Sequence, residues 1–125
     1  MDPAPVLVVD DDPAFRALLA LAVRNLGLEP IEAGSAKEGY RIARRRPLLA
    51  IVSDYSMPGP SGLELLQRIR GKGLEMPFVL ASSLFPDDVP TAAMDAGADA
   101  VLDKTLLLDE LPSILGRAAR DAVAA

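Results

Sequence analysis

Short apolar segments alternate with longer amphipathic segments five times along the chain, and this alternation constrains the fold more than any other feature. The apolar segments are residues 6–9, 49–52, 78–81 and 100–102, together with the weaker segment 29–33, which contains two glutamates. They are too short for buried helices and contain many β-branched residues, so they predict strands. Strands that alternate with helices favour a parallel sheet with right-handed crossovers and helices on both faces. We therefore expect an α/β fold with a five-stranded parallel sheet.

Capping residues indicate where the first three helices begin. Asp12 followed by Pro13 is typical of an N-cap and a first helical residue, and Gly27 is placed to end that helix. Residues 35–38 and 61–64 have the Ser-x-x-Glu spacing of a capping box. Each of these three helices therefore has a defined start.

Prolines complicate the last two helices. Pro86 and Pro90 restrict the fourth helix, which cannot begin much before Asp88 and has room for about two turns before Gly97. Pro112 falls in the last helix. It lies either in the first turn of a helix that starts late or at a kink, and the sequence leaves both open.

Composition excludes several kinds of chemistry. The 125 residues are enough for a single domain, which we expect over residues 1–125. The absence of cysteine excludes disulfides and thiol nucleophiles, and the absence of histidine excludes a Ser-His-Asp triad and an imidazole phosphate carrier. The formal charge of −5 repels a phosphate backbone, so we expect no direct contact with nucleic acid.

Nothing in the sequence indicates a membrane partner. The longest apolar run, residues 17–23, is far shorter than the roughly 20 residues that cross a bilayer. The amino terminus has no signal-peptide pattern. We therefore expect a cytoplasmic protein.

Polar side chains gather where the predicted strands end, which is where parallel α/β sheets bind their ligands. They are Asp10, Asp11 and Asp12 after the first strand, Asp54 after the third, Ser82 and Ser83 after the fourth, and Asp103 and Lys104 after the fifth. If the first and third strands are neighbours, their carboxylates converge, and two such charges about 5 Å apart repel by about 3 kcal/mol at an effective dielectric near 20. Clustered carboxylates suit a hard cation, so the sequence predicts a Mg²⁺ site.

Each of these residues also has a simpler interpretation. Asp12 serves as an N-cap whatever the other acids do, and those acids are then solvated loop residues. Lys104 alone is consistent with a surface lysine. Ser82 alone is consistent with a local backbone hydrogen bond.

Four segments together resemble the response regulator receiver domain. They are residues 8–13 (VVDDDP), 54–62 (DYSMPGPSG), 77–82 (PFVLAS) and 96–99 (AGAD), the last leading to Lys104. The resemblance covers nearly the whole chain. It implies a single receiver domain over residues 1–125, with the flavodoxin-like or CheY-like strand order 2-1-3-4-5.

The resemblance also implies a metal site and a phosphorylation site. Asp54 would be the phosphoacceptor and a Mg²⁺ ligand, and Asp11 would bind Mg²⁺ directly. Asp10 would act on the metal through water, and the backbone carbonyl of Ser56 would be a further ligand. A carboxylate nucleophile with a divalent cation is chemically suited to phosphoryl transfer.

Ser82 and Lys104 would then bind the phosphoryl group on Asp54. The resemblance implies a donor phosphohistidine on a sensor histidine kinase or a histidine phosphotransfer protein. This chain, which has no histidine, would be the acceptor. A downstream effector protein or domain would respond to the change. Such a domain belongs to two-component or phosphorelay signalling and is not an enzyme beyond its own phosphorylation and dephosphorylation.

Three features depart from the family pattern. Thr105 follows the lysine where the family has a proline, usually in a cis bond, so we expect a trans bond and a shifted loop. Val101 stands where the family commonly has an aromatic switch residue. With the two prolines of the fourth helix, these features suggest that signalling uses helix reorganisation or a different face.

Two alternative functions remain. A receiver-like interaction module that works without phosphate fits Val101, Thr105 and the unusual fourth helix. A haloacid-dehalogenase-like phosphatase would use an Asp-x-Asp pattern, which Asp10 and Asp12 satisfy, but the chain has no length for a capping domain.

Overall fold

The computed structural model describes residues 3–124, in which five strands alternate with five helices as the sequence predicts. The strands are β1 (Val6–Val9), β2 (Pro30–Ala33), β3 (Ala50–Asp54), β4 (Phe78–Ser82) and β5 (Ala100–Asp103). The helices are α1 (Pro13–Asn25), α2 (Ala36–Arg45), α3 (Gly62–Gly71), α4 (Val89–Asp95) and α5 (Lys104–Ala124). The α/β class is therefore confirmed.

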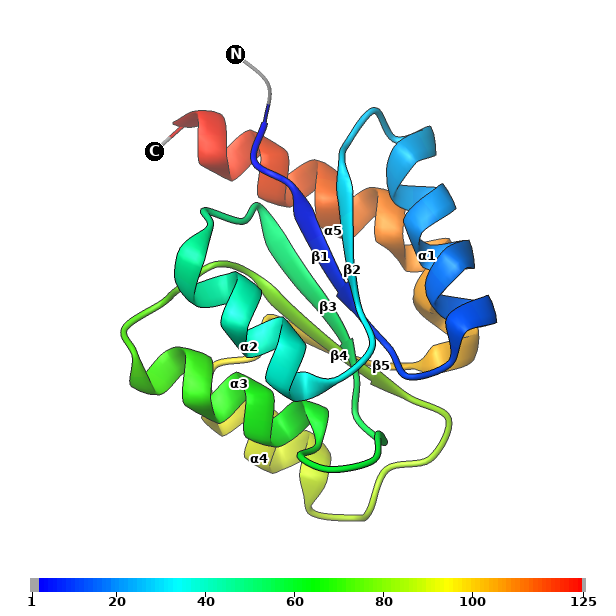
Figure 1. Cartoon of the computed structure of the whole chain (residues 1–125), viewed down its shortest axis with the longest axis vertical. Helices are drawn as coiled ribbons and strands as arrows, with labels where there is room; N and C mark the ends of the chain where they lie inside the picture. The colour runs from blue at the N-terminus through cyan, green and yellow to red at the C-terminus, as the bar shows by residue number, and fades with distance from the viewer. Residues whose placement is uncertain (1–2, 125) are drawn as a thin grey trace.

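The strands form one parallel sheet in the order β2-β1-β3-β4-β5, which confirms the expected topology. Figure 1 shows α1 and α5 on one face of the sheet and α2, α3 and α4 on the other. The register pairs Val9 with Ser53, and Ser82 with Asp103. The residues that follow these pairs therefore meet at one edge of the sheet, the carboxyl edge.

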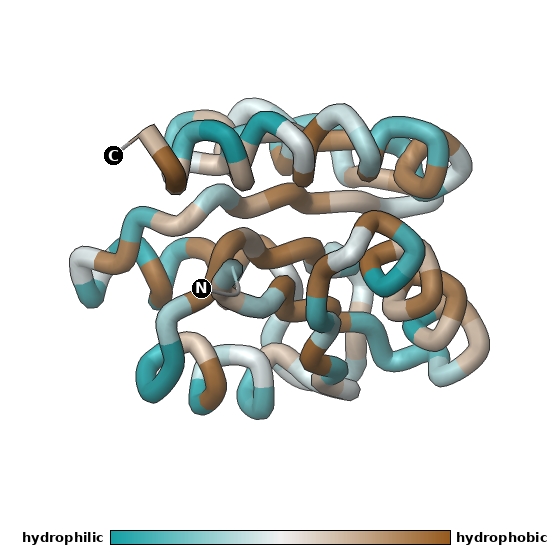
Figure 2. The backbone as a smooth tube through the Cα atoms, turned by 90° about the horizontal axis from the view of Figure 1, so that it is seen from above, coloured by the Kyte–Doolittle hydropathy of each residue, from teal (hydrophilic) through white to brown (hydrophobic). Residues whose placement is uncertain are grey.

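Alternating strand residues fill two apolar cores, one on each face of the sheet. Leu7 and Val9 pack toward α2, α3 and α4, while Val6 and Val8 pack toward α1 and α5. All four side chains are fully buried. In Figure 2 the helical turns alternate between hydrophobic and hydrophilic residues, as expected for helices with one face on a sheet.

The predicted start and end of α1 are confirmed. The Asp12 side chain accepts a hydrogen bond from the backbone N–H of Ala14 at 3.0 Å, and Pro13 is the first helical residue. Gly27 follows the helix with a φ of +80°, a conformation that favours glycine. The chain thus leaves β1 and enters α1 through a short, capped turn.

The two predicted capping boxes differ in detail. At α3 both halves form: Ser61 accepts from the Glu64 N–H and Glu64 accepts from the Ser61 N–H. At α2 the Ser35 side chain accepts from the Glu38 N–H, but Glu38 accepts from the backbone of Gly34 instead of Ser35. At α2 the glutamate therefore bonds the residue before the N-cap instead of the N-cap itself, so only one half of the capping box forms.

The two proline-containing helices resolve differently. Helix α4 is seven residues long and begins at Val89, as the prolines predict. Helix α5 begins at Lys104, directly after β5, and Pro112 lies inside it. The late start considered for this helix is therefore wrong. Pro112 lacks the N–H that would bond the carbonyl of Leu108, so one helical hydrogen bond is missing there.

Helix α5 is held to the sheet by an apolar face. Leu107, Leu111 and Leu115 are buried against α1 and the strands, and this burial outweighs the local cost of the proline. Although α5 has 21 residues, neither it nor any other helix within residues 3–124 is long and apolar enough to cross a membrane.

Candidate functional site

Asp10 places a buried carboxylate at the carboxyl edge of the sheet. It follows β1 directly, is 1% exposed, and accepts a hydrogen bond from the Asp12 N–H at 2.9 Å. Arg16 donates to the backbone carbonyl of Asp10 at 2.9 Å and pairs with Glu32 on β2 at 3.1 Å. These contacts hold the turn between β1 and α1 in one conformation.

Asp54 ends β3 beside Asp10, because β1 and β3 are neighbouring strands. Its side chain is nearly buried, and its backbone carbonyl accepts a hydrogen bond from the Ser53 hydroxyl at 2.9 Å. Gly62, the first residue of α3, lies against this carbonyl, and a Cβ atom there would collide with it. The absence of a side chain at Gly62 therefore allows the start of α3 to pack directly against the backbone of Asp54.

Asp11 brings a third carboxylate to the same place. Oxygen atoms of Asp10, Asp11 and Asp54 lie within 4.8 Å of one another, although Asp11 itself is exposed. At that separation two unscreened carboxylate charges repel by about 3.5 kcal/mol at an effective dielectric near 20. The predicted convergence of acids from the first and third strands is confirmed.

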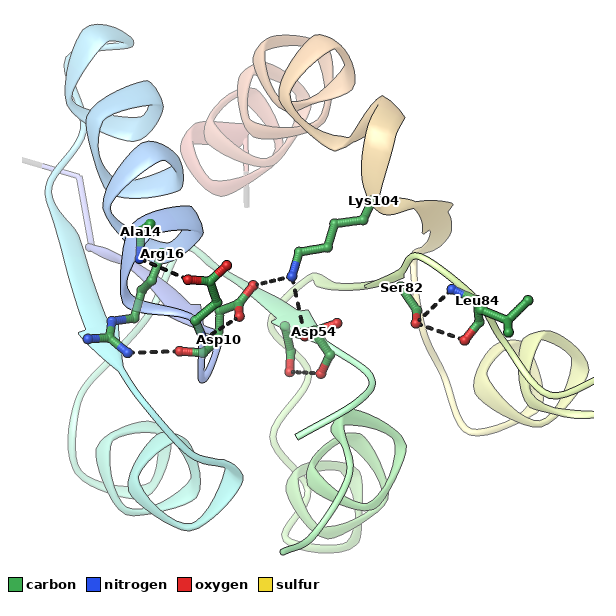
Figure 3. A network of polar contacts seen from close by, with 9 residues as sticks. Asp10, Ala14, Arg16, Asp54, Ser82, Leu84 and Lys104 are labelled. Carbon is green, nitrogen blue, oxygen red and sulfur yellow. Dashed lines mark hydrogen bonds and ion pairs between the residues drawn. The ribbon is translucent and has the colours of Figure 1, made fainter. Parts of the chain in front are cut away.

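Lys104 supplies the opposite charge. Its ammonium nitrogen lies 2.8 Å from Oδ2 of Asp10 and 3.4 Å from Oδ2 of Asp54, and Figure 3 shows the side chain reaching between the two. No hydrogen bond to Asp10 Oδ2 is found within residues 3–124, so this contact is the compensation for that buried oxygen. The nitrogen also lies 4.4 Å from the ring centroid of Phe15.

Burial and charge shift the pKa values of Asp54 and Lys104. Burial raises the pKa of Asp54, and the charge of Asp10 adds to this while Lys104 opposes it. Burial acts to lower the pKa of Lys104, but contacts with Asp10 and Asp54 outweigh it and raise the pKa. The site thus contains a carboxylate that is less stable in its charged form than in water, beside a firmly protonated lysine.

Ser56 and Ser82 share a pocket of about 430 Å³ with Asp54 and Lys104; its remaining lining residues are Ser83 and Leu84. Ser82 ends β4, and its hydroxyl donates to the carbonyl of Leu84 at 3.0 Å and accepts from the Leu84 N–H at 3.3 Å. Figure 3 shows this pair at one side of the carboxylate cluster. The local hydrogen bond considered for this serine is therefore present.

Two of the acids at the strand ends serve as caps outside the cluster. Asp12 caps α1, as described above. Asp103 accepts from the backbone N–H of Thr105 at 2.8 Å and from its hydroxyl at 2.7 Å, and these bonds lower the pKa of Asp103. The peptide bond before Thr105 is trans, as predicted for a residue other than proline, and helical structure replaces the expected loop.

A larger pocket of about 680 Å³ lies elsewhere, between the start of β1 and the end of α5. It is lined by Pro3, Ala4, Leu48, Leu49, Pro77, Ala118, Ala119, Asp121, Ala122 and Val123. Asp121 is the one ionisable side chain among these residues. The smaller pocket at the carboxyl edge therefore holds the groups capable of chemistry.

Comparison with known protein families matches residues 6–115 to the response regulator receiver domain. The chain belongs to this family. The receiver domain is 35% identical over 113 residues to the response regulator MprA of Mycobacterium sp. (strain KMS), covering 87% of this chain and 47% of MprA. It is 32% identical over 114 residues to the sensor histidine kinase RcsC of Salmonella typhi, covering 91% of this chain and 12% of RcsC. The chain thus spans half or less of these relatives.

Solved structures agree with the receiver fold. The receiver domain of a Francisella response regulator superposes with a TM-score of 0.87 at 24% identity, covering 96% of this chain and 99% of that one. The amino-terminal domain of an uncharacterized Wolinella succinogenes protein gives a TM-score of 0.91 at 26% identity, with 98% of each chain covered. Receiver domains of this family are regulatory components of two-component systems.

Sequence reasoning missed two residues that shape the site, Phe15 and Arg16. Both lie in the first turn of α1, next to the carboxyl edge, where they contact Lys104 and the backbone of Asp10. The predicted start of α1 at Pro13 contained this signal, because the first turn of a helix after a strand lies at that edge of the sheet.

Proposed function

We propose that this receiver domain takes a phosphoryl group from a phosphohistidine onto Asp54 in the presence of Mg²⁺, in the cytoplasm, and thereby changes its binding to a partner. The observation that supports this most is the clustering of three carboxylates within 4.8 Å of one another, two of which pair with one ammonium group. One lysine leaves the cluster with an excess of negative charge. The carboxylates suit a divalent cation, and the ammonium suits a phosphoryl group.

The residues present fit Mg²⁺. Asp10, Asp11 and Asp54 offer carboxylate oxygens, the donors that Mg²⁺ prefers, and these oxygens lie within 4.8 Å of one another. The carbonyl of Ser56, beside the same pocket, would complete the set of protein ligands. When bound, Mg²⁺ would neutralise charge on the oxygens of the transferring phosphoryl group.

Asp54 is suited to act as the nucleophile. A carboxylate oxygen of Asp54 would form a bond to phosphorus as the bond from phosphorus to the donor's histidine nitrogen breaks, and the electron pair of that bond stays on the imidazole. Burial raises the pKa of Asp54, so its carboxylate is more basic than a solvated one. Lys104 is already beside Asp54 and would pair with a phosphoryl oxygen.

Ser82 would be the second group to bind the phosphoryl oxygens. Its hydroxyl lines the same pocket as Asp54 but is bonded to the backbone of Leu84. Binding to the phosphoryl group would exchange this local bond for a charge-assisted one, which is about twice as strong as a bond between neutral groups. The loop after β4 would then be released, and a downstream effector would recognise the altered surface.

The chain is similar to part of a response regulator and to part of a sensor histidine kinase. A sensor histidine kinase or a histidine phosphotransfer protein is the donor that the chemistry calls for. The phosphatase alternative is disfavoured because Asp12 points into the α1 cap, away from Asp10 and Asp54. An interaction module that works without phosphate would bind its partner equally before and after phosphorylation.

Mass spectrometry after treatment with acetyl phosphate tests the proposal. We expect the chain to gain one phosphoryl group in the presence of Mg²⁺, and peptide mapping to place it on Asp54. Asp54→Asn is the control for the site, and addition of EDTA is the control for the metal. Labelling at another residue, or labelling that is unaffected by EDTA, would contradict the proposal.

A further inference from the structure

The backbone of Lys104 is fixed, but its long side chain is not held by its own helix. Lys104 is the first residue of α5 and follows β5 without a loop, and Asp103 bonds the backbone of Thr105. A lysine side chain has four flexible methylene groups, so a fixed backbone does not determine where the ammonium lies. The carboxylates of Asp10 and Asp54 attract the ammonium, and a further contact along its path would restrict where it lies.

Phe15 provides a further contact for the ammonium group. Its ring centroid is 4.4 Å from the Lys104 nitrogen, within the distance of about 6 Å at which a cation interacts with an aromatic face. The ring is partly buried and packs against the core between α1, α5 and the sheet. This packing restrains the ring that contacts Lys104.

We propose that Phe15 is a positioning residue that keeps the Lys104 ammonium at the carboxylate cluster while allowing it to change partners. The ammonium now lies nearer to Asp10 than to Asp54, at 2.8 Å and 3.4 Å. An aromatic face attracts a cation without the directional demand of a hydrogen bond. The ammonium can therefore move from Asp10 toward a phosphoryl oxygen on Asp54 without leaving Phe15.

The surroundings of Lys104 leave its side chain room to move. The Lys104 side chain is 17% exposed, and Phe15 and Thr105 line a shallow hollow beside it. Without the ring, the two carboxylates alone would hold the ammonium, and the flexible side chain would gain entropy and hydration by turning more often into that hollow. The effect on phosphorylation rests on the proposed function, whereas the placement of the ammonium does not.

Nuclear magnetic resonance tests the placement directly. The Hε protons of Lys104 should show an upfield ring-current shift in the unmodified chain. This shift should be lost in Phe15→Leu, which keeps an apolar side chain, and retained in Phe15→Tyr, which keeps the ring. Phe85→Leu is the matched control, because Phe85 contacts Tyr55 and is not among the aromatic partners of Lys104. An unchanged shift in Phe15→Leu would overturn the proposal.

Phosphorylation kinetics test the consequence. With saturating acetyl phosphate and Mg²⁺, Phe15→Leu should react about two- to tenfold more slowly and Phe15→Tyr at nearly the original rate. In a Lys104→Met background, Phe15→Leu should cause no further loss. An equal loss in the Leu and Tyr variants, or an undiminished effect of Phe15→Leu without Lys104, would show a packing role and overturn the proposal. An unmodified chain that is never phosphorylated but shows the Phe15-dependent shift would refute the proposed function alone.

Discussion

Lys104 and Asp10 form the shortest ion pair of the site, with 2.8 Å between the ammonium nitrogen and Oδ2 of a carboxylate that is 1% exposed. Removing one partner of a buried pair leaves an uncompensated charge, which typically costs about 3 to 5 kcal/mol. Lys104→Met should therefore lower the free energy of unfolding by about 3 kcal/mol in EDTA, measured by urea denaturation. Mg²⁺ should restore part of this loss. A Lys104→Met chain as stable as the original in EDTA would show that the Lys104–Asp10 pair does not stabilise the fold.

Asp54→Asn should stabilise the chain at neutral pH without Mg²⁺. Burial raises the pKa of Asp54, so its charged form is disfavoured by folding. The penalty is fully present above the folded-state pKa and disappears as the pH falls below the unfolded value, near 3.9. Urea denaturation at pH 7 should show a higher midpoint for the variant, and the difference should shrink toward pH 4. A lower midpoint at pH 7 would show that Lys104 overcompensates the burial.

Asp103 should stabilise the start of α5. Its hydrogen bonds from the backbone and hydroxyl of Thr105 lower its pKa, so its stabilising effect is complete above the unfolded pKa and is lost as the pH falls through the lower folded value. Asp103→Ala should lower the melting temperature at pH 7, whereas Asp103→Asn, which keeps an accepting oxygen, should lower it less. Thermal denaturation followed by circular dichroism distinguishes the two variants; equal losses would exclude a capping role.

Leu84 should slow the loss of a phosphoryl group from Asp54. It lines the pocket with Asp54, and an apolar side chain there hinders an attacking water. Leu84→Asn should shorten the lifetime of the phosphorylated chain on the order of several-fold, measured by the release of inorganic phosphate. Leu106→Asn changes another exposed leucine outside this pocket and is the control. Equal lifetimes for Leu84→Asn and the original chain would refute this role.

Phosphorylation should alter the segment between β4 and α5. Helix α4 has seven residues, and the Asp88 side chain makes no capping hydrogen bond, so its start is weakly held. Release of Leu84 by Ser82 would act directly on this segment. We expect chemical-shift changes across residues 84–108 between the free and phosphorylated forms. Their absence would mean that partners recognise another face.

The elements of the fold were largely predictable because local signals and the global fold agree. Buried apolar runs predicted the strands, and Asp12 with Pro13 predicted the start of α1. The strand order came from the family resemblance. Helix α5 was the main exception. Its start at Lys104 depends on the burial of Leu107 and Leu111 against the sheet, and this tertiary packing overrides the tendency of Pro112 to delay the start of a helix.

The candidate site was predictable as a set of carboxylates and less so as a set of contacts. The register of the parallel strands brings Asp10 beside Asp54 independently of their side-chain conformations. The contacts of Phe15 with Lys104, and of Arg16 with the Asp10 carbonyl, depend on side-chain conformations between distant segments. Sequence patterns carry no direct information on these conformations.

Because α5 follows β5 without a loop, the helix begins at Lys104, the residue whose ammonium lies in the site. A helix of 21 residues is about 30 Å long, so a tilt of about 5° at its start displaces the far end by roughly 3 Å. A small change in the orientation of α5 at the carboxyl edge of the sheet would therefore move the far end of the helix, on the opposite side of the molecule.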